Sequence, residues 1–195
     1  MARPRSQEAR QAALDATVDL LLAGGVEGVT FDEVAARSGV AKTTLYRHFG
    51  SKQAMVVAAA SSCFVELPTP DNGDLRRDLR EIFNRWQDKE KAPKVPDLMP
   101  VLLAGSDRDP ELHTLVLAML DERRRPIRTV LQLAQLRREI DPDLDLDLAI
   151  ALLTGPFVQR RMVDRQAITD EFRDAVLEQV VAGLRATRHG AVELA

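Results

Sequence analysis

The segment from Thr30 to Lys52, TFDEVAARSGVAKTTLYRHFGSK, most constrains the fold, because it predicts two short helices joined by a tight turn. Thr30 and Glu33 have the T-x-x-E spacing of a capping box, in which the Thr30 hydroxyl caps the helix and Glu33 reaches back to the Thr30 amide. Gly39 follows the first helix, where a left-handed turn residue is needed. This arrangement is typical of a helix-turn-helix, whose second helix enters the DNA major groove.

The polar side of the second helix supports the same interpretation. Between Val40 and Lys52 the sequence has no Asp or Glu, and its cations are Lys42, Arg47 and Lys52. Hydroxyl groups and one imidazole lie among them at helical spacing: Thr43, Thr44, Tyr46 and His48. Cations bind phosphates, and hydroxyls can reach base edges. The alternative is a solvated surface helix that happens to lack acidic residues.

The run from about Ala12 to Met55 resembles the DNA-binding domain of TetR-family transcriptional regulators. Its segment GVAKTTLYRHFGSKQAM matches the family pattern Gly-Val…Leu-Tyr-x-His-Phe-x-x-Lys at every anchor. One departure follows Lys52, where the family usually has an acidic residue and Leu, whereas this chain has Gln53-Ala54. The motif covers about a quarter of the chain, and the remainder resembles the family in architecture only.

The resemblance implies roles for individual residues. Base contacts are implied for Lys42, Thr43 and Tyr46. Phosphate contacts are implied for Thr30, Thr44, Tyr46, His48 and Lys52, and Arg47 would lie beside them, facing the DNA. It also implies a homodimer that reads a palindromic double-stranded operator, and a repressor that a small-molecule effector releases.

Composition predicts an all-helical protein, because only 4% of the residues are aromatic and β-branched runs are scarce. No apolar stretch approaches the ~20 residues of a membrane span, and the first ten residues lack the apolar core of a signal peptide. We therefore expect a cytoplasmic protein without membrane contact. The single cysteine, Cys63, excludes an internal disulfide framework and a cysteine zinc cluster, and it is read as a small hydrophobic residue or, alternatively, a redox sensor.

Charge is distributed unevenly along the chain. Residues 1–52 hold seven Lys or Arg and six Asp or Glu, whereas the whole chain carries a net charge of −3. The basic character is therefore local, as expected for one DNA-facing surface on an acidic molecule. Arg3, Arg5 and Arg10 could form an arm along the DNA or a solvated tail.

Two domains are predicted, a three-helix DNA-binding domain over residues 1–52 and a larger helical domain for effector binding and dimerisation over residues 53–195. Capping residues and prolines place further boundaries. The expected features are a helix from the cap Ser6 to about Ala23, helices from Ser51 to about Val65 and from Leu75 to about Lys89, a short apolar piece from Leu98 to Ala104, a helix opened by Asp109 and kinked or divided at Pro126 before ending near Arg138, a helix capped by Asp145 and bent at Gly155-Pro156, a last helix capped by Thr169, and a loose tail after about Arg188.

The last two helices have broad apolar faces that predict a two-fold dimer interface, the alternative being internal core. Bulky and flexible side chains in the second domain are candidates to line an apolar effector pocket, or are ordinary core. They are Trp86, Met99, Leu102, Met119, Phe157 and Met162.

Catalytic chemistry is not indicated. The three histidines fall in different predicted elements, none in a metal-ligand spacing, and there is no Gly-rich phosphate loop or nucleophile elbow. We therefore expect no enzyme activity, no metal and no cofactor. Two alternatives stay open: a helical small-molecule-binding protein with a non-functional helix-turn-helix, and a helical enzyme.

Overall fold

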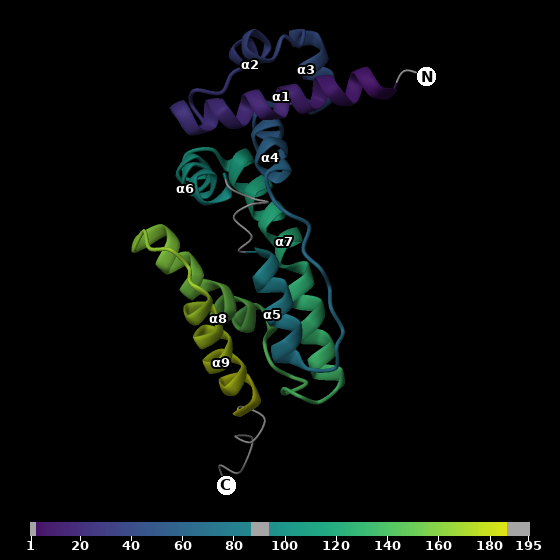
Figure 1. Cartoon of the computed structure of the whole chain (residues 1–195). Helices are drawn as coiled ribbons and strands as arrows, with labels where there is room; N and C mark the ends of the chain where they lie inside the picture. The colour runs from purple at the N-terminus through teal and green to yellow at the C-terminus, as the bar shows by residue number, and fades with distance from the viewer. Residues whose placement is uncertain (1–2, 87–93, 187–195) are drawn as a thin grey trace. The chain divides into compact units, whose positions relative to one another are not determined.

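The computed structural model describes residues 3–86 and 94–186, with the side chains of all but residues 3–5, 86, 95 and 96. Every regular element in these residues is helical, which confirms the predicted fold class (Figure 1). The elements are α1 (Arg3–Gly24), α2 (Phe31–Ser38), α3 (Lys42–Phe49), α4 (Lys52–Ser62), α5 (Leu75–Trp86), α6 (Val95–Ser106), α7 (Pro110–Leu136), α8 (Leu146–Val158), the π-helix η1 (Gln159–Val163) and α9 (Asp170–Ala186). They form two compact units, each with its own hydrophobic core.

The first unit contains α1 to α4, α6 and the start of α7. Helix α1 contacts α2, α3, α4 and α6, and in Figure 1 it lies between the α2–α3 pair and α6. Its buried side includes Leu14 and Leu21. The helix begins at Arg3, so the predicted cap at Ser6 is wrong, because Pro4 is tolerated in a first turn and allows an earlier start. The predicted arm or tail is likewise helical backbone from Arg3 onward.

Helix α6 contacts α1, and its Gly105 lies against the turn that follows α1. A Cβ at Gly105 would lie 2.5 Å from Cγ2 of Val26 in that turn, so the glycine allows a close approach. At the other end of α6, Lys94 Nζ lies 3.1 Å from Asp19 Oδ1 of α1. The sequence predicted only a short apolar piece here, and the longer helix forms because Leu98 and Leu102 are fully buried against the first core.

Helix α7 belongs to both units. Asp109 caps it as predicted, its Oδ1 accepting from Leu112 N at 3.1 Å. The helix continues through Pro126, so of the two predicted outcomes, a kink or a division, the division is wrong. Burial of Ile127 and Val130 on either side of the next turn offsets the one backbone hydrogen bond that a proline removes.

The second unit contains α5, the rest of α7, α8, η1 and α9. The Phe157 ring stacks on Phe83 at 4.8 Å between centroids and meets Phe172 edge-on at 5.7 Å. Asp145 and Thr169 cap α8 and α9 as predicted. Gly155-Pro156 lies within α8, which the π-helix η1 follows directly.

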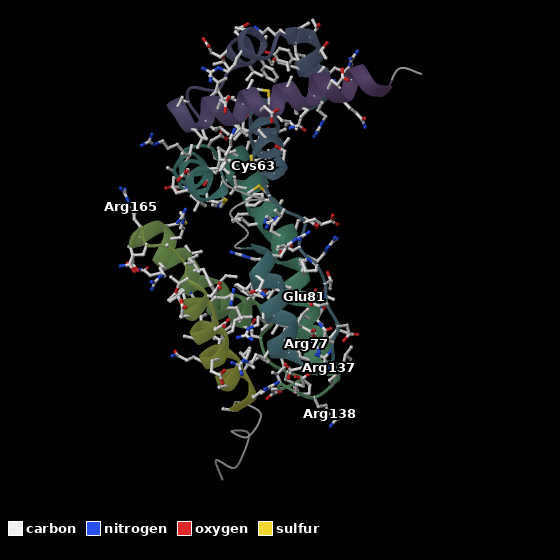
Figure 2. The ribbon with its side chains drawn as sticks, in the orientation of Figure 1. Cys63, Arg77, Glu81, Arg137, Arg138 and Arg165 are labelled. Atoms are coloured by element: carbon white, nitrogen blue, oxygen red, sulfur yellow. The ribbon has the colours of Figure 1, made fainter. Side chains whose placement is uncertain are left out.

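A polar cluster joins α5, α7 and α9 within the second unit. The Glu139 carboxylate accepts from Leu75 N at 3.0 Å, from Arg137 at 2.6 Å and from Arg185 at 3.0 Å. Figure 2 labels Arg137, which also lies 3.5 Å from the fully buried Asp78. Burial alone would raise the pKa of Glu139, but the Leu75 amide and the two guanidinium groups outweigh it and lower that pKa.

Two further expectations concern the chain around α4. That helix ends at Ser62, three residues before the predicted end, and Cys63 follows it (Figure 2). Partial burial raises the pKa of the Cys63 thiol, which disfavours the reactive thiolate.

None of the helices in residues 3–86 and 94–186 combines the length and apolarity needed to cross a membrane. The predicted loose tail after Arg188 lies outside the described residues.

Candidate DNA-binding surface

A side-chain cap begins α2, and a glycine turn leads from α2 to α3. The Thr30 hydroxyl accepts from Glu33 N at 3.1 Å, which confirms the predicted cap. The reciprocal bond, in which the Thr30 amide would donate to the Glu33 carboxylate, is not among those formed by the described residues. Gly39 has the left-handed φ of 71° and donates to Ala35 O at 3.0 Å. The chain therefore reverses sharply, and Leu45 of α3 is fully buried against the first core.

Helix α3 carries six of the eight predicted DNA contacts, and four of these six are exposed. Lys42, Thr43, Tyr46 and Arg47 are exposed, whereas Thr44 and His48 are half-buried. The helix has no acidic residue in its first turn and no side-chain cap, since Ala41 precedes it. Its first N–H groups and its positive dipole end are thus left for an external anion.

Two side chains of α2 contact two side chains of α3, one through an ion pair and one through ring stacking. The Lys42 ammonium lies 2.7 Å from Asp32 Oδ1 and 2.8 Å from Asp32 Oδ2. The Tyr46 ring stacks on Phe31 with centroids 3.9 Å apart, and Tyr46 is still 49% exposed. Sequence reasoning missed both pairs, because partners ten and fifteen positions apart meet only once the turn geometry is known.

The remaining predicted phosphate contacts differ in accessibility. Lys52 begins α4, which Ser51 caps by accepting from Ala54 N at 3.1 Å. The Thr30 hydroxyl accepts one hydrogen bond and keeps its own proton to donate. The Nε2 atom of His48 is buried and has no hydrogen-bond partner, so His48 does not offer this atom to a ligand in the present conformation. Arg10 lies over the Phe49 ring at 5.7 Å.

The predicted effector-pocket residues with described side chains are divided between the two units. Met99, Leu102 and Met119 belong to the first hydrophobic cluster, and Phe157 belongs to the second. Met162 is half-buried in η1, and the side chain of Trp86 lies outside the described structure. A solvent-open depression of about 580 Å³ lies in the second unit, and its lining includes none of the five candidates whose side chains are described. Its lining is Glu66, Leu67, Pro68, Glu81, Asn84 and Arg85.

The described side chains form no group of potential metal ligands. Across residues 3–86 and 94–186, no three His, Cys, Asp or Glu side chains come together as metal ligands. Two of the three histidines fall in this part, His48 in α3 and His113 in α7.

Comparison with known proteins covers nearly the whole chain. A family model described as "Bacterial regulatory proteins, tetR family" matches residues 13–59, and one described as "Tetracyclin repressor-like, C-terminal domain" matches residues 69–180. The chain is 32% identical over 186 residues to the DNA-binding transcriptional repressor TetR of Mycobacteroides abscessus. The aligned region covers 91% of this chain and 97% of that relative.

Two further comparisons agree. The chain is 25% identical over 189 residues to the uncharacterized HTH-type transcriptional regulator YdeS of Bacillus subtilis (strain 168), covering 95% and 94% of the two chains. The crystal structure of the TetR family transcription regulator SCO0332 superposes with a TM-score of 0.68 at 28% identity, over 90% of this chain and 98% of that one.

Proposed function

Because this chain belongs to the TetR family of helix-turn-helix transcriptional regulators, we propose that it is a dimeric repressor that binds a palindromic operator and is released by a small effector. The observation that carries the DNA-binding part is the exposed, acid-free side of α3 beside an uncapped helix start. Such a surface favours phosphates by charge and by dipole, and its hydroxyl and ammonium groups can reach base edges.

The proposed contacts divide by kind. Lys42, Thr43 and Tyr46 would read bases in the major groove. Phosphates would be held by Thr30, Thr44, Tyr46, His48 and Lys52, with Arg47 beside them. His48 requires a side-chain rotation to use Nε2, because that atom is buried. In this proposal residues 1–52 touch DNA, and residues 53–195 bind the effector and dimerise. The protein would act in the cytoplasm.

Apolar and small residues on α8 and α9 support dimerisation. Leu148 and Leu152 of α8 are 55% and 48% exposed. On α9, Gly183 is exposed, and a Cβ built there would meet nothing within 4 Å. Three exposed alanines of α9 form a stripe of small residues with Gly183, at helical spacing: Ala175, Ala182 and Ala186. Large exposed apolar side chains beside small residues suit close packing against a second copy related by a two-fold axis.

The effector is proposed to be small and mostly apolar, and to bind in the second unit. Phe157 and Met162 are the members of the candidate set that lie in this unit and have described side chains. An effector that prefers a conformer with weak DNA affinity must itself bind less tightly when DNA is bound. Phe157→Leu, chosen because Phe157→Ala would leave a large cavity, should weaken effector-induced DNA release in a folded protein. An unchanged effector response would remove Phe157 from the site.

Selection of bound sequences from a random duplex library tests the proposal. A palindromic winner, released by a compound from an effector screen, would support the dimeric repressor. Failure to enrich any sequence would favour a helical ligand-binding protein with a non-functional helix-turn-helix. Turnover with a pH profile set by one perturbed group would instead indicate an enzyme.

A further inference from the structure

An ion pair bridges the two helices of the helix-turn-helix. Lys42 is the first residue of α3 and Asp32 the second residue of α2, and both carboxylate oxygens lie within 2.8 Å of the Lys42 ammonium. The side chains are 45% and 76% exposed, so a ligand can reach the pair. The hydrogen bond to Asp32 raises the pKa of Lys42, which keeps the ammonium protonated.

Stability accounts for only a modest part of the role of Asp32. Its exposed ion pair contributes little to folding because water and salt screen it, and its place in the first turn of α2 adds a small favourable interaction with the helix dipole. The α2 cap uses the Thr30 hydroxyl and the Glu33 backbone, not Asp32. For binding any duplex, Asp32 is unfavourable, since it neutralises a cation of the acid-free helix and repels phosphates.

We propose that Asp32 determines DNA sequence discrimination by holding the Lys42 ammonium toward base edges and away from the phosphate backbone. This inference rests on the proposed function and adds a residue that contacts neither bases nor phosphates. Asp32 acts through Lys42 and is therefore a positioning residue.

The chemistry of lysine explains why such a residue is needed. A free lysine has a flexible stem and pairs with the nearest phosphate, which carries no sequence information. An ammonium has three donors, and at least one remains when Asp32 engages one or two of them through its two oxygens. Guanine presents two acceptors, O6 and N7, in the major groove. The pair therefore favours guanine in each half-site, and the carboxylate penalises any placement that brings a phosphate to this point.

The test repeats the random-duplex selection with wild type, Asp32→Asn, Lys42→Met and the double variant, followed by affinity measurements on the wild-type winner and on random duplex. Asp32→Asn keeps the shape and removes the charge. It should bind random duplex about threefold or more tightly, with a steeper salt dependence, by about one phosphate contact per protomer. Its preference at the base position that Lys42→Met relaxes should fall about fivefold or more.

Glu33→Gln provides the matched control, because it removes the same charge one residue away on α2 without touching Lys42. This variant should leave base preference unchanged. In the Lys42→Met background, Asp32→Asn should have no further effect on preference at that position. Equal discrimination by Asp32→Asn and wild type would overturn the inference while leaving the proposed function intact, as would equal effects of Asp32→Asn and Glu33→Gln. No enriched sequence for wild type would overturn both.

Discussion

The rings of Phe31 and Tyr46 stack with centroids 3.9 Å apart and planes inclined by 24°, which fixes an exposed tyrosine on the proposed DNA-reading side of α3. The stack predicts that ring and hydroxyl act separately. Tyr46→Phe keeps the ring and loses the hydroxyl, so operator binding should weaken about tenfold or more, as for a hydrogen bond to a charged group. Phe31→Leu keeps the hydroxyl and loses the ring contact, and binding should weaken about two- to tenfold.

Fluorescence anisotropy with a labelled operator measures both effects, and circular dichroism checks that the variants fold. If Tyr46→Phe bound as tightly as wild type, the hydroxyl would have no phosphate partner. If Phe31→Leu alone had no effect, the stack would not position Tyr46.

Lys52 tests the phosphate assignment. Each phosphate contact contributes about 0.9 to the slope of log K against log salt concentration. Lys52→Ala should therefore reduce the slope by about two for a dimer and weaken operator and random duplex alike. Binding titrations at several salt concentrations give the slope. Loss of base preference with an unchanged slope would contradict the assignment.

Gly105 tests the packing of α6 on α1. Gly105→Ala adds a methyl group 2.5 Å from Val26 Cγ2, and overpacking of this kind costs about 1–3 kcal/mol. The gain in helix propensity returns about 1 kcal/mol, so we expect net destabilisation. Urea denaturation of Gly105→Ala, Val26→Ala and the double variant completes the cycle. Val26→Ala should relieve part of the cost of the alanine at position 105, because it removes Cγ2 and leaves the Val26 Cβ 3.0 Å away. Strictly additive effects would show that the two residues do not press on each other.

The Glu139 carboxylate makes the free energy of unfolding depend on pH under acidic conditions. Its folded pKa is lowered, so its contribution is fully present above about 4.5, the ordinary value, and is lost as pH falls through the lower folded value. Glu139→Gln should cost about 1–3 kcal/mol at pH 7 and should flatten the fall in unfolding free energy below pH 4.5.

Glu178→Gln is the matched control, because Glu178 pairs with Arg76 at the surface and is 57% exposed. Its loss should change the unfolding free energy by less than about 1 kcal/mol. Equal pH dependence of wild type and Glu139→Gln in chemical denaturation would contradict the prediction.

Gly183 tests the proposed dimer face. Arginine fits there within one chain and improves helix propensity, so Gly183→Arg should fold normally. Against a second copy the long cation would block close approach, and sedimentation velocity should show a shift toward monomer. Gln132→Arg, at an exposed position of α7, should remain dimeric. A fully dimeric Gly183→Arg would place the interface elsewhere.

Local signals predicted local structure well. The caps at Thr30, Ser51 and Asp109 and the left-handed Gly39 were all identified from sequence, because each depends on neighbouring backbone. Helix ends set by tertiary packing were predicted less well. The helix through Pro126 continued because its buried side outweighs one lost hydrogen bond.

The candidate site divides in the same way. The exposed positions of α3 follow from helical spacing, whereas the couplings of Asp32 to Lys42 and of Phe31 to Tyr46 depend on how the turn brings two helices together. Size and flexibility alone select the pocket candidates. These properties do not distinguish the two hydrophobic clusters, and Met119 and Phe157 belong to different ones.

Titration of the selected operator and of a random duplex of equal length, at several salt concentrations, tests the central claim most directly. For a sequence-specific dimer we expect the two affinities to differ by about 10³-fold or more at physiological salt, with one dimer bound per palindrome. Equal, weak and strongly salt-dependent binding to both duplexes would contradict the account.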